Sequence, residues 1–391
     1  MRPLRTAAGA AGLVGVALGY AALEASWFKC VFLDAAVLPR GSAPIKLLHI
    51  SDLHLTAGQQ RKAAWVAALA ELEPDLVVST GDHIGAGNAL DLLDQALAPL
   101  MDFPGGFVFG SNDFFAPSLR NPLAYLWRKS QTPHWRRPDL PTAELRQLLT
   151  AGGWLDLNNA RGLAHTGSGP VELVGLGDPH LGFDRLPEPN QPDRDHDLSS
   201  RSPRRVVNHS GRGAACKRPQ PTGIVRQFPS FDGTWEAPPS NDLADTQSPA
   251  RPVVRLGVVH APYLAAVRAL VTDGSQLILA GHTHGGQVAL PLIGALVTNS
   301  DLPARFASGL HRLAPMPGSA QAEPRFLHVS AGLGTSPYAP IRFACRPQAT
   351  LITLVSSDTT PGSDIEAASN AAFPQVNTAR CPMPTRARLF S

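Results

Sequence analysis

The sequence predicts a layered α/β protein. Short apolar runs alternate with segments of helical spacing through the first half of the chain, which is typical of layered α/β proteins. Hydrophobic residues make up 43% of the 391 residues, as in a globular protein, and the length allows one large domain or two medium ones. Polar residues follow several of the apolar runs, so we expect a functional site where the strands end.

The alternation begins after residue 44. Residues 45–50 ("IKLLHI") are apolar enough for a buried strand, and residues 59–73 place Trp65, Leu69 and Leu72 at helical spacing. The other expected elements are a helix at 88–100 and strands at 74–80, 105–110, 171–176, 254–259, 276–280, 326–330 and 350–355.

The N-terminus has the pattern of a membrane anchor. Arg2 and Arg5 precede residues 6–23, an uncharged stretch that is just long enough to span a bilayer as a transmembrane helix. A cleaved signal peptide is the alternative, because a small-x-small cleavage pattern occurs at residues 19–21. We favour the uncleaved anchor. Positive charges on both sides of it do not settle its orientation, and we expect the domain on the extracytoplasmic side.

Two later segments have the composition of disordered chain. Residues 185–251 are rich in Pro, Arg, Asp and Ser and lack periodicity, which predicts a disordered insertion. The predicted organisation is an anchor at 1–28, a linker at 29–44, one domain at 45–356 that contains this insertion, and a disordered tail at 357–391.

Charge and cysteine content give no support to nucleic-acid binding, a zinc finger or a disulfide framework. The net charge of +3 gives no evidence for nucleic-acid binding, because basic residues cluster in the segment expected to be disordered. The four cysteines form no C-x-x-C pair, so neither a zinc-finger site nor a disulfide framework is predicted.

Carboxylate, imidazole and amide side chains follow five of the expected strands. In an open α/β sheet, the loops at the carboxyl ends of the strands converge on one crevice. Such side chains are ligands for divalent metals such as Mn²⁺, Fe²⁺ or Zn²⁺, and their number exceeds what one ion takes from protein. The sequence therefore predicts two metal ions, with Asp82 able to bridge them. The residues concerned are Asp52, His54, Asp82, Asn112, Asp113, His260, His282 and His284.

The order of these motifs resembles the calcineurin-like metallophosphoesterase superfamily. D-x-H, G-D, "GSND", an isolated histidine and G-H-x-H occur in sequence, and "HISDLH" and "AGHTHGGQ" are similar to membrane-associated bacterial members. The resemblance implies a four-layer α/β/β/α sandwich with a dinuclear metal centre. It also implies that a metal-bridging hydroxide attacks a phosphomonoester or phosphodiester in line.

The resemblance assigns ligands to each ion. Asp52, His54, Asp82 and His284 would hold the first metal. Asp82, His260, His282 and one residue of "GSND" would hold the second.

"GSND" departs from the G-N-H-[DE] element of the family. Ungapped alignment gives Ser111 the metal position, but we favour Asn112, because an amide oxygen is a common ligand of hard cations. No histidine is left there to protonate a leaving group. His180 and His83 are the candidate replacements, of which we favour His180. The alternative for His180 is a surface histidine in an Asp-Pro turn. Asp113 would orient a neighbouring group or cap a turn.

The remaining polar residues have simpler interpretations. His49 and His328 are interpreted as structural residues within strands, and His83 as a loop or supporting histidine. Arg342 is the one arginine that we expect near a substrate phosphate.

Two classes of function follow. The first is a metal-dependent phosphoesterase, for which the anchor makes a lipid-linked phosphate an attractive substrate. The alternative is a membrane-anchored, metal-binding pseudo-phosphatase that acts through protein interactions, suggested by "GSND" and the long insertion. A nuclease is disfavoured, since no basic stripe with interleaved aromatic residues is present.

Overall fold

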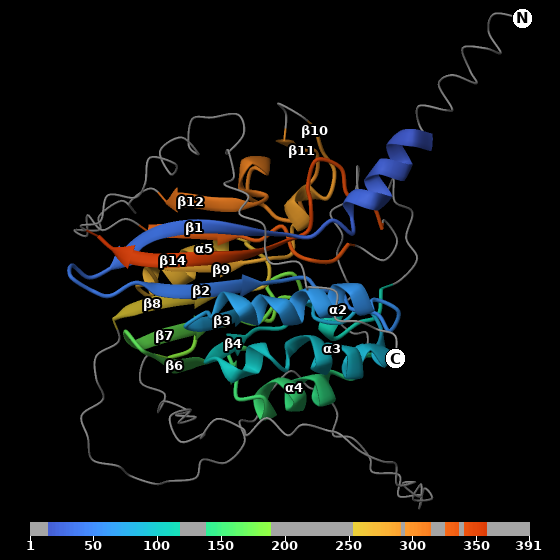
Figure 1. The fold of residues 1–391 in the computed structure, drawn as a ribbon. Helices are drawn as coiled ribbons and strands as arrows, with labels where there is room; N and C mark the ends of the chain where they lie inside the picture. Colours follow the sequence, from blue (N-terminus) through green and yellow to red (C-terminus); the bar gives the residue numbers. More distant parts are fainter. Residues whose placement is uncertain are drawn as a thin grey trace, which may run out of the picture. The chain divides into compact units, whose positions relative to one another are not determined.

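Two six-stranded sheets form the centre of the fold in a computed structural model, which describes residues 15–117, 138–188, 253–290, 294–313, 325–335 and 340–357 (Figure 1). The first sheet has the order β1-β14-β2-β3-β4-β5. Its strands are β1 (Lys29–Leu38), β2 (Ile45–Ile50), β3 (Leu76–Ser79), β4 (Gly105–Phe107), β5 (Leu155–Asp156) and β14 (Gln348–Ser356).

The second sheet has the order β12-β13-β9-β8-β7-β6. Its strands are β6 (Arg161–Thr166), β7 (Gly169–Gly175), β8 (Val254–Val258), β9 (Leu277–Ala280), β12 (Gly309–Leu313) and β13 (Arg325–Val329). Strands β2 to β5 are parallel to one another, as are β7, β8, β9 and β13. The carboxyl ends of each parallel set therefore share one edge of the sheet.

Helices cover the outer face of each sheet. The first sheet is covered by α2 (Gln60–Ala67), α3 (Leu90–Leu97) and α4 (Thr142–Ala151), and the second by α5 (Leu264–Thr272). Short 3₁₀ helices and one two-stranded ribbon complete the described elements: η1 (Ala68–Leu72), η2 (Gly87–Ala89), η3 (Leu100–Asp102), η4 (Ser111–Asp113), η7 (His284–Gly286), η8 (Ala304–Phe306), β10 (Ala289–Leu290) and β11 (Gly294–Ala295).

Alternation along the strands builds three apolar layers. Successive strand residues point to opposite faces, so Leu47 and Leu48 on β2 enter different layers, as do Ile278 and Leu279 on β9. Leu47 and Leu279 belong to the layer between the sheets. Leu48 packs with the helices of the first sheet, and Ile278 packs with α5. The result is the four-layer α/β/β/α arrangement that the family resemblance implies.

The predicted strands of the sheets are present, but the predicted linker is partly wrong. Residues 29–38 form β1, which pairs in parallel with β14 and has buried residues at both ends of its span. Phe32 and Asp34 are exposed because β1 is an edge strand, so the segment lacks strict alternation of apolar and polar residues. Without that alternation, the sequence did not predict a strand here. The helix expected at 59–73 divides into α2 and η1, since Ala68 begins a 3₁₀ turn.

The predicted anchor and disordered segments lie mostly outside the described residues. Residues 15–24 are helical, and their last turn is held by Glu24, whose carboxylate accepts the Ala344 and Cys345 N–H groups at 3.0 and 2.9 Å. Among the described residues, no helix has the length and apolar character needed to cross a membrane. Apart from a few flanking residues, the predicted insertion and tail are not described.

Candidate metal centre

The predicted ligands come from loops at the carboxyl ends of strands in both sheets. Asp52 and His54 follow β2, and Asp82 follows β3. His260 follows β8, and the His282 and His284 pair follows β9. All of these side chains except His284 are buried, with exposed fractions of 7% or less, and His284 is partly buried.

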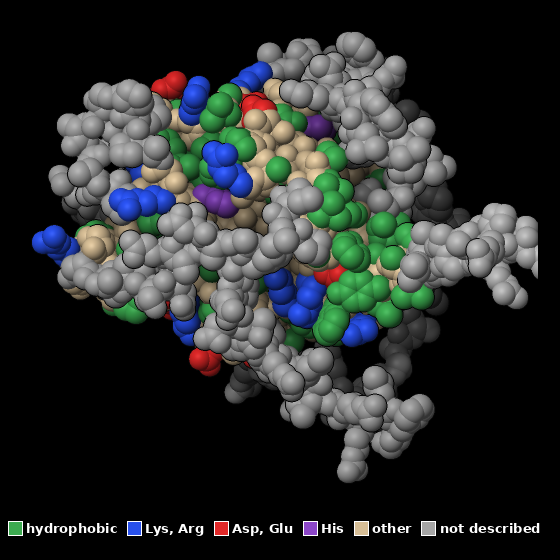
Figure 2. Space-filling view, turned by 90° about the horizontal axis from the view of Figure 1, so that it is seen from above, with side chains coloured by type: hydrophobic (Ala, Val, Ile, Leu, Met, Phe, Trp, Pro, Cys, Tyr) green, Lys and Arg blue, Asp and Glu red, His purple; other side chains and the backbone are tan. Residues whose placement is uncertain are grey.

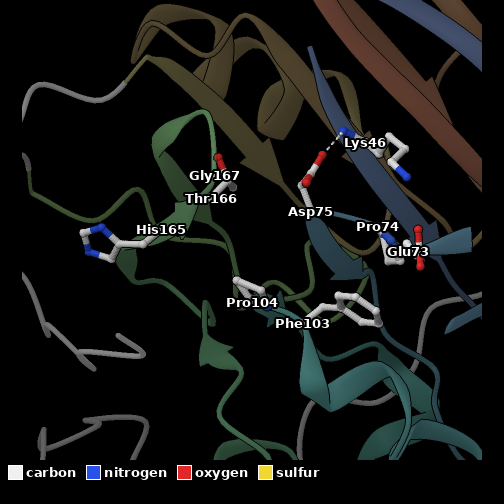
Figure 3. Close-up of a pocket in the computed structure, with 9 residues that line it drawn as sticks. All are labelled: Lys46, Glu73, Pro74, Asp75, Phe103, Pro104, His165, Thr166 and Gly167. Atoms are coloured by element: carbon white, nitrogen blue, oxygen red, sulfur yellow. Dashed lines mark hydrogen bonds between the residues drawn. The ribbon is translucent and has the colours of Figure 1, made fainter. Parts of the chain in front are cut away.

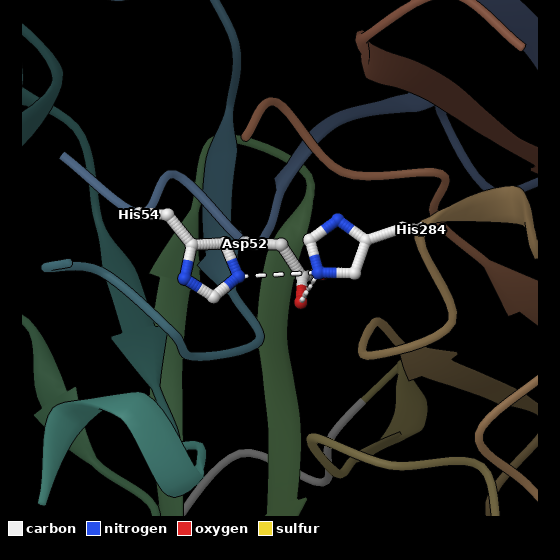
Figure 4. A group of neighbouring side chains, drawn as sticks. All are labelled: Asp52, His54 and His284. Carbon is white, nitrogen blue, oxygen red and sulfur yellow. Dashed lines mark hydrogen bonds and ion pairs between the residues drawn. The ribbon is translucent and has the colours of Figure 1, made fainter. Parts of the chain in front are cut away.

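Asp52, His54 and His284 form one group of convergent side chains (Figure 4). The Nε2 atoms of His54 and His284 are 3.1 Å apart, and His284 Nε2 lies 3.7 Å from Asp52 Oδ1. The Nδ1 atom of His54 is buried without a hydrogen-bond partner among the described residues. Each ring therefore directs Nε2 at the same small volume, as imidazoles do around a shared cation.

His260 and His282 converge in a second group, and their hydrogen bonds define their tautomers. His260 Nδ1–H donates to the Thr80 carbonyl at 2.6 Å, and His282 Nε2–H donates to the Asn299 carbonyl at 3.1 Å. These bonds leave His260 Nε2 and His282 Nδ1 with free lone pairs, and the two atoms are 3.2 Å apart. Two lone pairs at this distance repel unless a proton or metal ion lies with them.

Asp82 lies between the two groups. Its Oδ2 atom is 3.4 Å from His54 Nε2 and 3.5 Å from His260 Nε2. Asp52, Asp82 and His260 also form a set of potential metal ligands by themselves. One carboxylate oxygen is thus within reach of both histidine pairs, which is the geometry of a bridging ligand.

The charges of the site favour a cation. Burial raises the pKa of Asp52, whereas the neighbouring histidines and the Asn112 hydrogen bond outweigh burial at Asp82 and lower its pKa. Burial alone would lower the pKa of His260, but Asp82, Asp178 and Asp52 outweigh it and raise the pKa to about 9. The carboxylates therefore stabilise positive charge at His260, and a divalent ion would meet the same field.

Five of these residues have strained backbone conformations. The φ angles are 50° at Asp52, 42° at His54, 54° at Asp82, 68° at His282 and 50° at His284. Non-glycine residues in this left-handed region cost on the order of 1–3 kcal/mol each, and such strain concentrates at ligand-binding sites. The strain turns each side chain toward the shared volume between the sheets.

The "GSND" element places Asn112, rather than Ser111, against Asp82. The Asn112 backbone N–H donates to Asp82 Oδ1 at 2.8 Å, and its side-chain amide donates to Asp82 Oδ2 at 2.7 Å. Gly110 permits this approach, because a Cβ there would lie 2.5 Å from the His260 ring. Asn112 therefore lies directly beside the carboxylate of Asp82, and its role as a metal ligand stays a prediction.

Asp113 holds the Asp82 loop. Its fully buried carboxylate accepts the backbone N–H groups of Asp82 at 2.9 Å, His83 at 2.7 Å and Gly110 at 3.0 Å, and the His83 Nδ1–H at 3.0 Å. Three of these bonds come from the loop after β3, which carries Asp82, and one comes from Gly110 in the loop of Asp113 itself. This arrangement favours the supporting role over direct contact with a substrate.

His180 lies beside the second group. Its ring centroid is 4.8 Å from that of His282, and its Nδ1 lies 2.7 Å from the Tyr263 hydroxyl. The His180 backbone N–H donates to Asp178 Oδ1 at 2.9 Å. Asp178 is buried, which raises its pKa to about 7. His180 is therefore not a remote surface histidine. Tyr263 beside it was not predicted, because a tyrosine in a turn is common and no motif marks it.

The expectation for Arg342 is wrong. Its guanidinium is fully buried and donates to the carbonyls of Ala331 at 2.7 Å and of His284 at 3.3 Å, so it is not available to a substrate phosphate. His49 and His328 are buried within strands, as predicted. His83 is a supporting histidine, also as predicted, because its ring and backbone both bond to Asp113.

A separate cavity of about 410 Å³ lies away from these residues (Figure 3). Its lining comes from the segments that begin strands, such as Lys46 on β2 and Pro104 before β4, and from the β6–β7 turn. It therefore lies at the opposite ends of the strands from the metal-ligand candidates, and it contains none of them.

Comparisons with known proteins identify the family of the chain. The model of the family described as calcineurin-like phosphoesterase matches residues 45–286. The chain is 23% identical to phosphodiesterase YaeI of Escherichia coli (strain K12), over 85% of this chain and 90% of that protein. It is 24% identical to the uncharacterized metallophosphoesterase YkuE of Bacillus subtilis (strain 168), over 83% of this chain and 84% of that protein. A solved structure, TT1561 of Thermus thermophilus, is 11% identical with a TM-score of 0.33, over 74% of this chain and 91% of that one.

Proposed function

Because the chain belongs to the calcineurin-like phosphoesterase family, we propose that it is a metal-dependent phosphoesterase that hydrolyses a phosphomonoester or phosphodiester. One observation carries the proposal. Two pairs of imidazole nitrogens, all buried except that of the partly buried His284, face each other at 3.1 and 3.2 Å. Asp82 Oδ2 lies within 3.5 Å of one nitrogen of each pair. The name of the YaeI relative supports a phosphodiester as one candidate substrate.

The two groups would hold two divalent ions, of Mn²⁺, Fe²⁺ or Zn²⁺. The proposed ligands of the first are Asp52, His54, Asp82 and His284, and those of the second are Asp82, Asn112, His260 and His282. Bound ions would neutralise the phosphoryl oxygens and lower the pKa of the attacking water. The chain's own contribution is to keep Asp82 ionised, since its pKa is lowered, and to hold two of the imidazoles in defined tautomers, through the Thr80 and Asn299 carbonyls.

We further propose that His180 protonates the leaving group. His180 adjoins His282, and the Tyr263 hydroxyl at 2.7 Å fixes its ring. The "GSND" element lacks the histidine that usually has this role in the family.

Hydrolysis assays on the full chain test the function. The metal-free protein receives Mn²⁺, Fe²⁺ or Zn²⁺ in turn, and release of p-nitrophenol is measured from a p-nitrophenyl phosphomonoester and from a bis-p-nitrophenyl phosphodiester. We expect turnover that depends on the added metal and disappears on chelation. Two bound metals per chain without turnover on either ester would instead support the pseudo-phosphatase.

We also propose that the N-terminal segment attaches the domain to a membrane, on the extracytoplasmic side, which would make a lipid-linked phosphoester accessible. Val16, Leu18 and Leu23 in the helix at 15–24 are 72%, 53% and 71% exposed, and Trp27 follows at 55%. Figure 2 shows hydrophobic side chains gathered at one side of a face, next to Lys and Arg side chains. Cosedimentation with anionic lipid vesicles should retain the full chain, and recovery in the supernatant would contradict the attachment.

A further inference from the structure

A chain of buried polar side chains links the second sheet to Asp52. His328 on β13 and His49 on β2 have their Nδ1 atoms 2.8 Å apart, and His49 Nε2 lies 2.9 Å from Thr80 Oγ1. Thr80 Oγ1 lies 2.7 Å from Ser51 Oγ, which lies 2.5 Å from Asp52 Oδ2. All five side chains have no measurable exposure to solvent.

The carboxylate of Asp52, at one end of this series of hydrogen bonds, determines which group donates in each bond of the series. An ionised carboxylate only accepts, so Ser51 O–H donates to Asp52 and Ser51 Oγ must accept from Thr80. Thr80 Oγ1 then accepts from His49 Nε2–H, and His49 Nδ1 accepts from His328 Nδ1–H. Burial lowers the pKa of His49 to about 3 and that of His328 well below its usual value, so both rings are neutral, as this order requires.

Close packing leaves these groups little room to move. A Cβ on Gly281 would overlap Ser51 Oγ and would lie 2.5 Å from Asp52 Oδ2 and 3.0 Å from Thr80 Oγ1. Three oxygens of the chain therefore lie against the backbone of the loop that precedes His282. The His282 backbone N–H also donates to both oxygens of Asp52, at 3.0 Å to Oδ2 and 3.1 Å to Oδ1.

We propose that Ser51, Thr80, His49 and His328 are positioning residues for Asp52: their chain of hydrogen bonds holds Oδ2 and directs Oδ1 toward the volume that His54 and His284 face. The inference rests on the proposed metal centre. Burying two hydroxyls and two imidazoles is costly where a bond is not made, and His328 Nε2 has no hydrogen-bond partner among the described residues. Apolar side chains at these positions would therefore stabilise the fold at least equally. What the polar chain adds is a fixed carboxylate orientation, an effect that typically changes metal affinity about 10- to 100-fold.

Manganese binding to the metal-free full chain tests the inference without using catalysis. The electron paramagnetic resonance signal of free Mn²⁺ gives the affinity of the wild type, of Ser51→Ala, of Thr80→Val and of the double variant. We expect each single substitution to weaken binding about 10- to 100-fold. Because Thr80 acts through Ser51, the double variant should bind no more weakly than Ser51→Ala alone.

Two further variants separate positioning from general damage to the core. Thr350→Val makes the same change at a fully buried threonine on β14 whose hydroxyl has no hydrogen-bond partner among the described residues, so it should bind Mn²⁺ as the wild type does. Thr80→Ser keeps the hydroxyl and should restore wild-type affinity. Thermal melting of each variant establishes that it is folded. If Thr80→Val does not fold, the Mn²⁺ affinity of Ser51→Ala alone tests the positioning role.

The outcomes distinguish the two proposals. A wild type that binds no Mn²⁺, Fe²⁺ or Zn²⁺ overturns the metal centre and this inference with it. A wild type that binds Mn²⁺, together with folded Ser51→Ala and Thr80→Val variants of equal affinity, overturns the positioning role alone. Equal losses of Mn²⁺ affinity in Thr80→Val and Thr350→Val would also overturn the positioning role.

Discussion

The Asp82→Asn variant will lose about 10³-fold or more of the metal-dependent turnover of the wild type. Asp82 Oδ2 lies 3.4 Å from His54 Nε2 and 3.5 Å from His260 Nε2, so one substitution weakens both proposed ion positions. The amide preserves the shape of the side chain but removes the negative charge. A loss of several kcal/mol of transition-state stabilisation corresponds to the expected change in rate.

Two measurements check this prediction: kcat and KM with saturating metal, and metal content by atomic emission. Bound metal should fall below that of the wild type, while circular dichroism stays the same. Asp75→Asn is the matched control, because Asp75 precedes the same strand that Asp82 follows and its carboxylate accepts the Lys46 N–H at 2.8 Å. Asp75→Asn should keep its turnover. Full turnover in Asp82→Asn would exclude the proposed mechanism.

The His180→Gln variant will lose about 10²- to 10⁴-fold in kcat on an alkyl phosphoester but little on a p-nitrophenyl ester. An alkoxide is a poor leaving group and needs a proton, whereas p-nitrophenolate leaves without one. Glutamine keeps a side-chain polar group near the Tyr263 hydroxyl, so the packing around His282 should persist.

The comparison of leaving groups separates proton donation from damage to the metal centre. His165→Gln is the control, since His165 lies on β6 at the cavity away from the site. It should leave both rates unchanged. An equal loss of His180→Gln activity on both esters would assign His180 to structure or metal binding instead.

Local patterns in the sequence predicted the strands of both sheets and the convergence of the candidate ligands, whereas the four-layer arrangement came from the family resemblance. Alternating residues such as Leu47 and Leu48 face different layers, and polar residues directly after an apolar strand come to the same edge of each sheet. Those two regularities depend on neighbours in the chain. They required no knowledge of how the sheets pack.

Features that depend on tertiary contacts could not be predicted in the same way. Strand β1 joins the sheet through β14, more than 300 positions later in the chain. The hydrogen-bonded series through Thr80 ends at His328, in the other half of the sequence. Arg342 is buried against the carbonyls of Ala331 and His284, which lie on two separate loops. Ser51 and Thr80 are common residues without a motif, so only the fold identifies them as neighbours of Asp52.

The proposed ligands follow strands of two different sheets, and this arrangement connects metal binding to the stability of the folded protein. Asp52, His54 and Asp82 belong to the first sheet, whereas His260, His282 and His284 belong to the second. Ions bound between these two sets of ligands would cross-link the halves of the sandwich in the folded state. Since ligands that bind only the folded state raise the free energy of unfolding, metal supply would set the lifetime of this protein as well as its rate of turnover.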